Sequence, residues 1–224
     1  MSPKATDARK GEILRAIYHK LFSVYGPQHW WPARTPFEVC VGAILVQNTN
    51  WQNVERAIEN LRRERVLEFS RLYCLSLERL KFLIRPAGYF NVKALRLKNF
   101  LDFLHENYKG ELKGLAAKPW PLARAELLSV NGIGHETADS ILLYALHKPV
   151  FVVDAYTKRL LLRHGFTEEA RDYASMQNLF MAHIDPDPVV YNEYHALIVQ
   201  FGKQVRADAQ EGENYLLRER KYFL

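Results

Sequence analysis

The sequence predicts an all-α fold from two observations. Apolar residues recur at helical spacing in three segments, which contain Leu14–Leu21, Val54–Leu61 and Ala138–Ala145. Glycine and proline residues that end helices lie between such segments, and no segment alternates apolar and polar residues as a half-buried strand does. Further helices are expected over residues 37–46, 77–83, 92–107, 125–130, 156–162, 173–183 and 189–203.

The length and the breaks in the chain predict two lobes. The chain has 224 residues, 48% of them hydrophobic, which is enough for a substantial core. The strongest breaks are the turn from Pro32 to Pro36 and the turn at Lys148-Pro149. The sequence therefore predicts a central helical lobe over residues 35–147 and a second helical lobe made from residues 1–34 and 148–224.

Charge and cysteine content restrict the partners and the compartment. Lysine and arginine total 31 against 25 acidic residues, and the net charge of +6 favours a polyanionic partner. Cys40 and Cys74 are too few for a disulfide framework or a cysteine metal site. The N-terminal segment lacks the apolar core of a secretory signal, and the longest clearly apolar run, Val41–Val46, is too short to span a bilayer. We expect a soluble cytoplasmic monomer without a membrane partner, associated with the nucleoid if bacterial.

Two glycines in the stretch LLSVNGIGHETADSI predict a tight turn between helices. Gly132 and Gly134 permit a backbone geometry that a side chain would obstruct. The next helix presents unpaired N–H groups and its positive dipole end, which favour an anion. A lone G-x-G is weak evidence, because ordinary turns between helices also contain it. Here an apolar helix precedes the turn, and a later apolar run, FVVD, ends in Asp154.

This arrangement resembles the helix-hairpin-helix of DNA repair glycosylases, followed by the glycine- and proline-rich loop and aspartate of the endonuclease III superfamily. Three more segments match in family order: GAILVQNTNWQNVERAIENL at 42–61, GYFNVKALRL at 88–97 and YHALIVQFGK at 194–203. The matches cover roughly residues 37–203. The resemblance implies a helical-barrel lobe with the hairpin at about 125–147, a second lobe, and a DNA-binding and active-site cleft between the two.

The resemblance also assigns contacts to double-stranded DNA with a damaged base. A phosphate would be held by the backbone amides of Gly132, Gly134 and Glu136. A monovalent cation, K⁺ or Na⁺, would be bound by the backbone carbonyls of Leu128, Val130 and Ile133. Gln47 falls where the family inserts a side chain into the duplex to replace the extruded base; its alternative role is an amide that caps the turn.

Asp154 is the predicted catalytic residue. Cleavage of an N-glycosidic bond builds positive charge on the sugar, and a carboxylate beneath the sugar stabilises that charge and orients the attacking water. The alternative role of Asp154 is N-cap of a helix that starts at Ala155, and the two roles are compatible.

Glu136 stands where family members that also cut the strand have a lysine, whose amine forms a Schiff base with the sugar. A carboxylate cannot form that imine, and an acid is favourable in the first turn of a helix in any case. Lys148 or Lys158 could approach from another direction, but no pattern argues for either. The resemblance thus implies a monofunctional glycosylase that leaves an abasic site in an uncut strand.

No cysteine follows Lys203, whereas endonuclease III ends in four cysteines that bind an iron-sulfur cluster. We therefore expect no iron-sulfur cluster and no other cofactor apart from the hairpin cation. Apolar residues expected to pack on the second lobe instead are Tyr215, Leu216, Leu217, Tyr222 and Phe223. Basic residues that either contact phosphate or remain solvated are Lys203, Arg206, Arg218, Arg220 and Lys221.

Four residues are assigned to a base pocket. Trp30, Trp31 and Pro32 lie at the predicted crossing between lobes, and Trp51 follows the polar turn QNTN. Tryptophan is often a core residue, and one of the adjacent pair is expected to be one. These residues resemble those of the superfamily's 3-methyladenine DNA glycosylases without a cluster, which implies that Trp30 and Trp51 sandwich the flipped base, Trp31 lines the pocket and Pro32 supports it. Aromatic faces attract the positive charge of an alkylated purine.

Two other functions remain open at this point. The first is a glycosylase for mismatched uracil or thymine, for which Asn48, Asn50 and Gln52 could supply amide and carbonyl contacts. The second is a helix-hairpin-helix protein that binds DNA without catalysis. The presence of both Asp154 and Gln47 argues against the second alternative.

Overall fold

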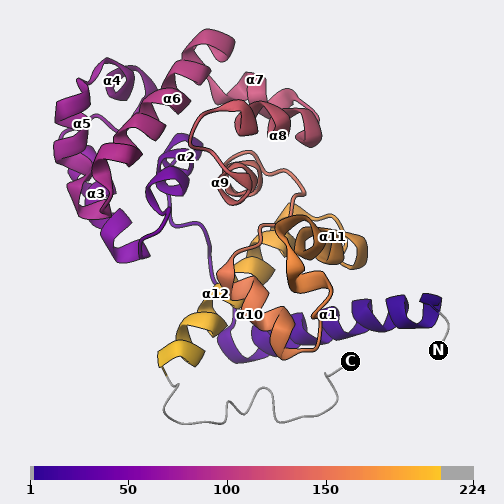
Figure 1. Cartoon of the computed structure of the whole chain (residues 1–224). Helices are drawn as coiled ribbons and strands as arrows, with labels where there is room; N and C mark the ends of the chain where they lie inside the picture. Colours follow the sequence, from indigo (N-terminus) through magenta and orange to yellow (C-terminus); the bar gives the residue numbers. More distant parts are fainter. Residues whose placement is uncertain (1–2, 208–224) are drawn as a thin grey trace. The chain divides into compact units, whose positions relative to one another are not determined.

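The structure, a computed structural model, describes residues 3–207, and every regular element in that range is helical (Figure 1). In chain order these are α1 (Pro3–Tyr25), α2 (Pro36–Leu45), α3 (Trp51–Arg63), α4 (Phe69–Cys74), α5 (Leu77–Ile84), the 3₁₀ turn η1 (Arg85–Ala87), α6 (Phe90–Tyr108), α7 (Leu112–Ala117), α8 (Trp120–Ser129), α9 (His135–Ser140), the π-helical turn η2 (Ile141–Ala145), α10 (Ala155–Arg163), the 3₁₀ turn η3 (Glu169–Arg171), α11 (Tyr173–His183) and α12 (Pro188–Ala207). Because no strand occurs between residues 3 and 207, the predicted all-α class is confirmed.

The chain divides into two compact units. Unit 1 takes in Met1–Trp30 and Pro149–Leu224, and unit 2 takes in Trp31–Lys148. For comparison, the sequence placed the lobe boundaries at 34/35 and 147/148. The residues expected to pack at the C-terminus, 215–223, lie outside the part of the chain that the structure describes.

Unit 2 is built around α2, which contacts α3, α6, α9 and η2 (Figure 1). The start of α2 is well specified, since the Thr35 hydroxyl accepts from the Glu38 amide at 3.1 Å and Pro36 occupies the first turn. Every residue from Glu38 to Leu45 is buried. A helix that is buried on all sides has little amphipathic pattern, and its burial stabilises unit 2 through apolar area removed from water.

Unit 1 has an aromatic core. The rings of Phe151 and Phe180 are stacked with centroids 4.0 Å apart, and Tyr194 meets both at close to a right angle. The hydroxyl of buried Tyr194 donates to the Leu14 carbonyl at 2.7 Å, which joins α12 to α1. This core fixes the buried segment Val150–Val153, which leads directly to α10.

Some elements differ from the prediction. Neither α4 nor α7 was expected, because each has six residues and buries a single one, Leu72 or Leu115, which gives no period to detect. The helix expected from Ala125 starts earlier, at Trp120, with Pro121 in its first turn. The segment Ala138–Ala145 continues past α9 as a π-helical turn, in which the Leu146 amide donates to the Ile141 carbonyl at 3.1 Å.

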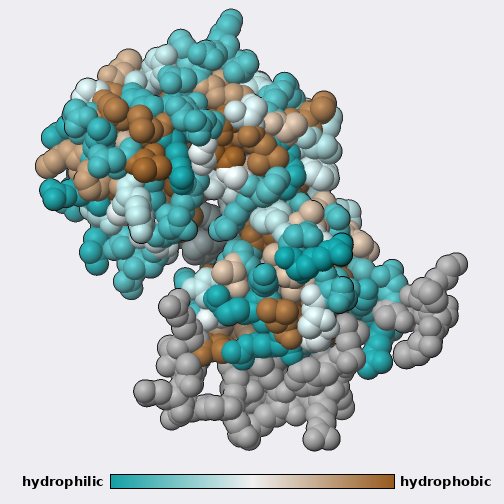
Figure 2. All heavy atoms as spheres, in the orientation of Figure 1, coloured by the Kyte–Doolittle hydropathy of each residue, from teal (hydrophilic) through white to brown (hydrophobic). Residues whose placement is uncertain are grey.

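The surface is mostly polar on the face that Figure 2 displays, where hydrophobic side chains appear in separate patches. Large exposed apolar side chains include Phe82, Tyr89, Leu122 and Val189. Between residues 3 and 207, no helix combines the length and the apolar composition that crossing a membrane requires.

Candidate functional site

The glycine turn of unit 2 joins α8 to α9. Gly132 has φ +96°, and a Cβ atom added to it would lie 2.3 Å from Cγ of Arg96. Gly134 has an extended backbone (φ −93°, ψ −179°), and an added Cβ would meet no atom within 4 Å. The sequence predicted that a side chain would be obstructed at both glycines. This is correct for Gly132, whereas at Gly134 no atom of the protein stands in the way.

A buried ion pair fastens the two helices of the hairpin. Asp139 on α9 is fully buried, and its two carboxylate oxygens accept from Nε and Nη2 of Arg124 on α8, at 2.6 and 2.9 Å. Nδ1 of His135 lies 3.3 Å from the same Nη2. A bidentate pair of this kind fixes both the spacing and the orientation of the helices it joins.

The first turn of α9 is open to solvent. Gly134, His135 and Glu136 are exposed, and no side chain caps the helix at Gly134. The carbonyls predicted to bind a cation come from the end of α8 and the turn: Leu128, Val130 and Ile133. The Val130 carbonyl accepts from the Ile133 amide at 3.0 Å and has a second lone pair for an ion. Neutral carbonyl oxygens suit a hard cation, so these residues fit the predicted ion.

The cysteines and the other metal-ligating side chains of the described residues are dispersed. This sequence contains two cysteines, fewer than the four thiolates of an iron-sulfur cluster, and both are free: Cys40 is buried in α2 and Cys74 is exposed at the end of α4. Within the described residues, no group of three or more His, Cys, Asp and Glu side chains is placed to hold a metal ion.

Gln47 lies in the turn between α2 and α3, and its side chain is held by the hairpin. Nε2 donates to the Gly132 carbonyl at 3.1 Å and to the Thr137 hydroxyl at 2.9 Å, while Oε1 accepts from Nη1 of Arg96. Asn48, the next residue, is exposed and has φ +53°. Insertion of Gln47 into a duplex would require these three contacts to break, whereas Asn48 is available without any such loss.

Three of the four residues assigned to the base pocket lie together in unit 2. The indole of Trp31 meets that of Trp51 edge to face, with ring centroids 4.9 Å apart, and packs at 5.1 Å against Tyr144. A pocket of about 250 Å³ is lined by Trp31, Pro32, Glu38, Trp51, Glu55, Ile58, Glu59 and Arg62. The fourth residue, Trp30, belongs to unit 1, where its carbonyl accepts from Nδ2 of Asn192 at 2.7 Å.

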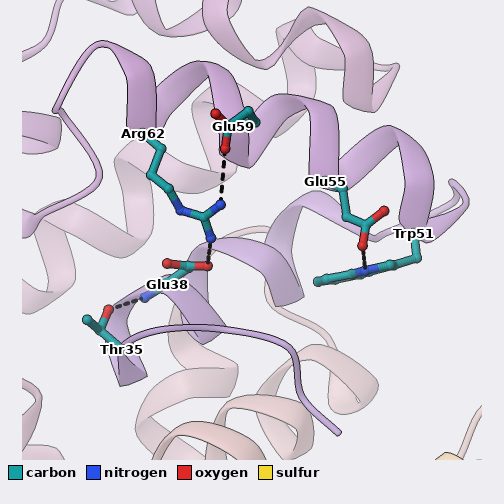
Figure 3. A network of polar contacts seen from close by, with 6 residues as sticks. All are labelled: Thr35, Glu38, Trp51, Glu55, Glu59 and Arg62. Carbon is teal, nitrogen blue, oxygen red and sulfur yellow. Dashed lines mark hydrogen bonds and ion pairs between the residues drawn. The ribbon is translucent and has the colours of Figure 1, made fainter.

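Three carboxylates line this pocket, and Figure 3 shows their polar contacts. Nε1 of Trp51 donates to Oε1 of Glu55 at 2.8 Å. Arg62 lies between two acids, with Nη2 2.5 Å from Oε1 of Glu38 and Nη1 3.2 Å from Oε2 of Glu59. Three carboxylates face one guanidinium, so the lining has an excess of negative charge. The prediction did not include these acids, although the spacing of Trp51 and Glu55, one helical turn apart, could have indicated their contact.

Asp154 caps α10 in unit 1. Its Oδ1 accepts from the amide and the hydroxyl of Thr157, at 2.8 and 3.1 Å, and the Asp154 amide donates to the same hydroxyl at 3.3 Å. This capping box confirms the N-cap role that the sequence offered as an alternative. The carbonyl of Phe151, three residues before Asp154, accepts from Nε2 of Gln177 at 2.7 Å, which steadies the segment leading to the carboxylate.

His195 is a neighbour of Asp154 that the sequence analysis missed. Its Nε2 lies 3.7 Å from Oδ2 of Asp154, and its side chain is buried on α12. Burial lowers the pKa of His195 below its ordinary value of 6.5, and the charge of Asp154 offsets part of that effect. The imidazole is therefore neutral at neutral pH. The available signal was a lone histidine within the apolar stretch 194–198.

Comparisons with known proteins agree on one family. Residues 41–186 match the model described as HhH-GPD superfamily base excision DNA repair protein. A Methanocaldococcus jannaschii protein named as a candidate DNA repair glycosylase is 51% identical over 197 residues, which are 87% of this chain and 89% of that protein. The thymine/uracil-DNA glycosylase of Pyrobaculum aerophilum is 27% identical over 180 residues, which are 79% of this chain and 74% of that protein.

Solved structures give the same result for the fold. The H. pylori 3-methyladenine DNA glycosylase, bound to 1,N6-ethenoadenine, superimposes with a TM-score of 0.74 and 30% identity, over 87% of this chain and 97% of that chain. An endonuclease III in a non-covalent complex with DNA has a TM-score of 0.73 and 22% identity over 86% of each chain, a likeness of fold alone.

Proposed function

Because the chain belongs to the HhH-GPD superfamily of base excision DNA repair proteins, among its DNA glycosylases, we propose that it removes alkylated purines such as 3-methyladenine from double-stranded DNA. The reaction is a hydrolysis that leaves an abasic site. The observation that supports this substrate best is the pocket of unit 2, in which two indoles and three carboxylates line one space. Alkylation of a purine ring nitrogen gives the base a positive charge, which both kinds of group attract.

The 3-methyladenine DNA glycosylase of H. pylori, at 30% identity over most of both chains, supports the same substrate class. A positively charged base is also a good leaving group, since departure from the sugar neutralises it. Such a base needs little protonation by the enzyme, so one carboxylate suffices for the chemistry.

Asp154 is the proposed catalytic residue. As the base leaves, positive charge develops on the sugar, and a fixed carboxylate stabilises that charge at no cost of reorganisation. Thr157 holds Oδ1 of Asp154 in place, so the carboxylate has a defined direction. Oδ2 is the oxygen available to orient a water molecule toward the sugar.

The hairpin is the proposed grip on the DNA backbone. The amides of Gly132, Gly134 and Glu136 would hold a phosphate, with a K⁺ or Na⁺ ion at the carbonyls of the turn. The open space around Gly134 supports this role, because a phosphate must approach the backbone closely there. Gln47 is one candidate to enter the duplex when the base leaves it, and the exposed Asn48 is a second, because the hairpin contacts that hold Gln47 do not involve Asn48.

Strand cleavage is not part of the proposed activity. The position from which a lysine would attack the sugar holds Glu136, which cannot form a Schiff base. Borohydride added during the reaction reduces a Schiff base to a permanent link between protein and DNA. We expect no such adduct, and its appearance on a gel would contradict the proposal of a monofunctional enzyme.

Release of free base from methylated genomic DNA tests the substrate directly. We expect 3-methyladenine in the soluble fraction by chromatography, and none with the Asp154→Asn variant. Methylated DNA incubated without the protein controls for spontaneous loss of methylpurines, and unmethylated DNA incubated with the protein should keep its bases. Methylated DNA that keeps all its methylpurines would rule out the proposed substrate.

A second candidate substrate is uracil or thymine opposite guanine, because a thymine/uracil-DNA glycosylase is among the relatives. Of the amides that could read such a base, Asn48 and Gln52 are exposed, whereas Oδ1 of Asn50 caps α3 by accepting from the Asn53 amide at 3.0 Å. Duplexes with U·G or T·G pairs, compared with methylated duplexes at equal enzyme concentration, separate the two substrates.

A further inference from the structure

The hydrogen bond between Trp51 and Glu55 joins an aromatic wall of the unit 2 pocket to a negative charge. Both residues lie on α3, one helical turn apart, and both line the pocket (Figure 3). We propose that Glu55 is a positioning residue that makes this pocket prefer cationic heteroaromatic rings over neutral rings of the same shape. The inference deepens the proposed function, on which it rests for the identity of the ligand.

Glu55 fixes the plane of the indole. Nε1 of Trp51 donates to Oε1 of Glu55 at 2.8 Å, and the ring of Trp31 meets the same indole at an angle of 88°. A bond at the nitrogen and an edge contact together restrict rotation of the Trp51 side chain. A ligand ring therefore meets a wall that is already oriented, and less rotamer entropy is lost when it binds.

Glu55 also changes the electronic character of the indole. A charged acceptor on an N–H group makes a stronger hydrogen bond than a neutral one and polarises the donor. Polarisation of the indole N–H toward a carboxylate leaves more electron density on the ring, and the attraction of a cation to an aromatic face grows with that density. A neutral ring gains the stacking contact alone.

The other charges of the pocket leave this effect in place. The one described cation of the lining, Arg62, is paired with both Glu38 and Glu59. Glu38 is 5% exposed, so its pairing with Arg62 is shielded from water. Arg62 and its two acidic partners together carry one negative charge, so no net positive charge in the lining opposes the charge of Glu55.

The pocket size indicates the class of ligand. Its volume of about 250 Å³ is below the range of roughly 300–1,000 Å³ that is usual for drug-sized ligands. A single heteroaromatic base fits such a space better than a whole nucleotide. The volume suits one purine ring, and the acidic lining favours a ring that carries a positive charge, as the alkylated purine of the proposed function does.

Binding of two matched purines tests the inference. The probes are 7,9-dimethylguanine, which is a cation at mildly acidic pH, and 9-methylguanine, which is neutral; they differ by one methyl group and one charge. Quenching of tryptophan fluorescence reports their dissociation constants for the full-length protein. For the wild type we expect roughly tenfold tighter binding of the cation.

Variants separate the charge of Glu55 from its hydrogen bond. Glu55→Gln keeps an oxygen acceptor for Nε1 and removes the charge, so the preference for the cation should fall roughly threefold, and the indoles and the other acids should keep the rest. Glu55→Asp keeps the charge on a shorter side chain and should retain more of the preference than Glu55→Gln does. Glu106→Gln, on the exposed face of α6, makes the same change of charge outside the pocket and should leave the preference unchanged.

Two results would overturn the inference. One is wild-type protein that binds neither purine or binds both equally, and the other is a preference for the cation that is undiminished in Glu55→Gln. These results are distinct from failure of the proposed function. Release of methylpurines with no change of preference in Glu55→Gln would contradict the inference alone, whereas a preference lowered in Glu55→Gln without release of any base would contradict the proposed function alone.

Discussion

The carboxylate of Asp154 directs one oxygen to the start of α10 and the other toward His195, whose Nε2 lies 3.7 Å from Oδ2. The capping role and the proposed catalytic role thus fall on different oxygens of one side chain. Oδ1 accepts both bonds from Thr157, and Oδ2 accepts neither. A substitution that keeps the first role and removes the charge can therefore separate folding from catalysis.

Asp154→Asn is expected to abolish base release without unfolding the protein. Asparagine is as good an N-cap as aspartate, so the capping box survives, while loss of the carboxylate should lower the rate constant of base release by roughly 100- to 1,000-fold or more. Single-turnover release of 3-methyladenine and a DNA-binding isotherm measure the two effects. A matched control is Asp172→Asn, which changes the N-cap of α11, where Asp172 accepts from the Ser175 amide at 2.7 Å. A wild-type rate in Asp154→Asn would disprove the assignment.

His195 should make the stability of the protein depend on pH below neutrality. Its folded-state pKa is lowered below 6.5 by burial, so the unfolded chain takes up its proton first as the pH falls. The stability that His195 contributes is therefore complete above pH 6.5 and is lost as the pH falls toward the folded-state pKa, by about 1.4 kcal/mol per pKa unit of lowering.

Urea unfolding of the wild type and of His195→Gln at a series of pH values measures this effect. The free energy of unfolding should fall less steeply with acid in the variant. His19→Gln, which changes an exposed histidine of α1, should behave like the wild type. Equal slopes in all three proteins would show that His195 keeps an ordinary pKa in the folded state.

The part of the site that the sequence predicted is the part encoded in short spacings. The apolar period of α3 and the glycine turn both depend on residues a few positions apart, and each was found where expected. The pairing of Glu38 with Arg62 joins residues on different helices, and neither residue interrupts the pattern of its own helix. The short distance between Asp154 and His195 likewise results from the packing of α10 against α12. Local patterns carry no information about such pairs.

Replacement by alanine should affect stability differently at the two glycines of the hairpin. Gly132→Ala places a side chain at φ +96°, against Arg96, and should cost about 1–3 kcal/mol of stability. Gly134→Ala meets no atom of the protein and should change stability by no more than about 0.5 kcal/mol. If the hairpin holds a phosphate, Gly134→Ala should still weaken DNA binding, because the methyl group occupies the approach to the backbone.

Thermal unfolding and a DNA-binding isotherm for each glycine variant give the comparison. Gly110→Ala is a matched reference for the stability measurement, since Gly110 also has a positive φ (+85°) and an added Cβ there would meet the ring of Phe69 on α4, outside the hairpin. Unchanged DNA affinity in Gly134→Ala would argue against a phosphate at this turn.

Substitutions at Gln47 and Asn48 should distinguish an effect on protein stability from an effect on base extrusion. Gln47→Ala removes the bonds to the Gly132 carbonyl and the Thr137 hydroxyl and the bond from the Arg96 guanidinium, and two neutral hydrogen bonds with one charged one correspond to about 2–6 kcal/mol. Asn48→Gly removes an exposed side chain and suits the positive φ of this position, so stability should stay nearly unchanged. Base release from a duplex should nevertheless fall by roughly tenfold in Asn48→Gly, because extrusion leaves a gap in the stack that costs a few kcal/mol.

A single-stranded substrate supplies the control for this last pair of variants. The base is already unpaired there, so Asn48→Gly should release it at the wild-type rate. If Gln47→Ala instead slows release from the duplex by more than its loss of stability explains, while Asn48→Gly has no effect, then Gln47 leaves the hairpin to enter the DNA. Breaking its three contacts in the free protein would then add to the free-energy cost of opening the DNA duplex.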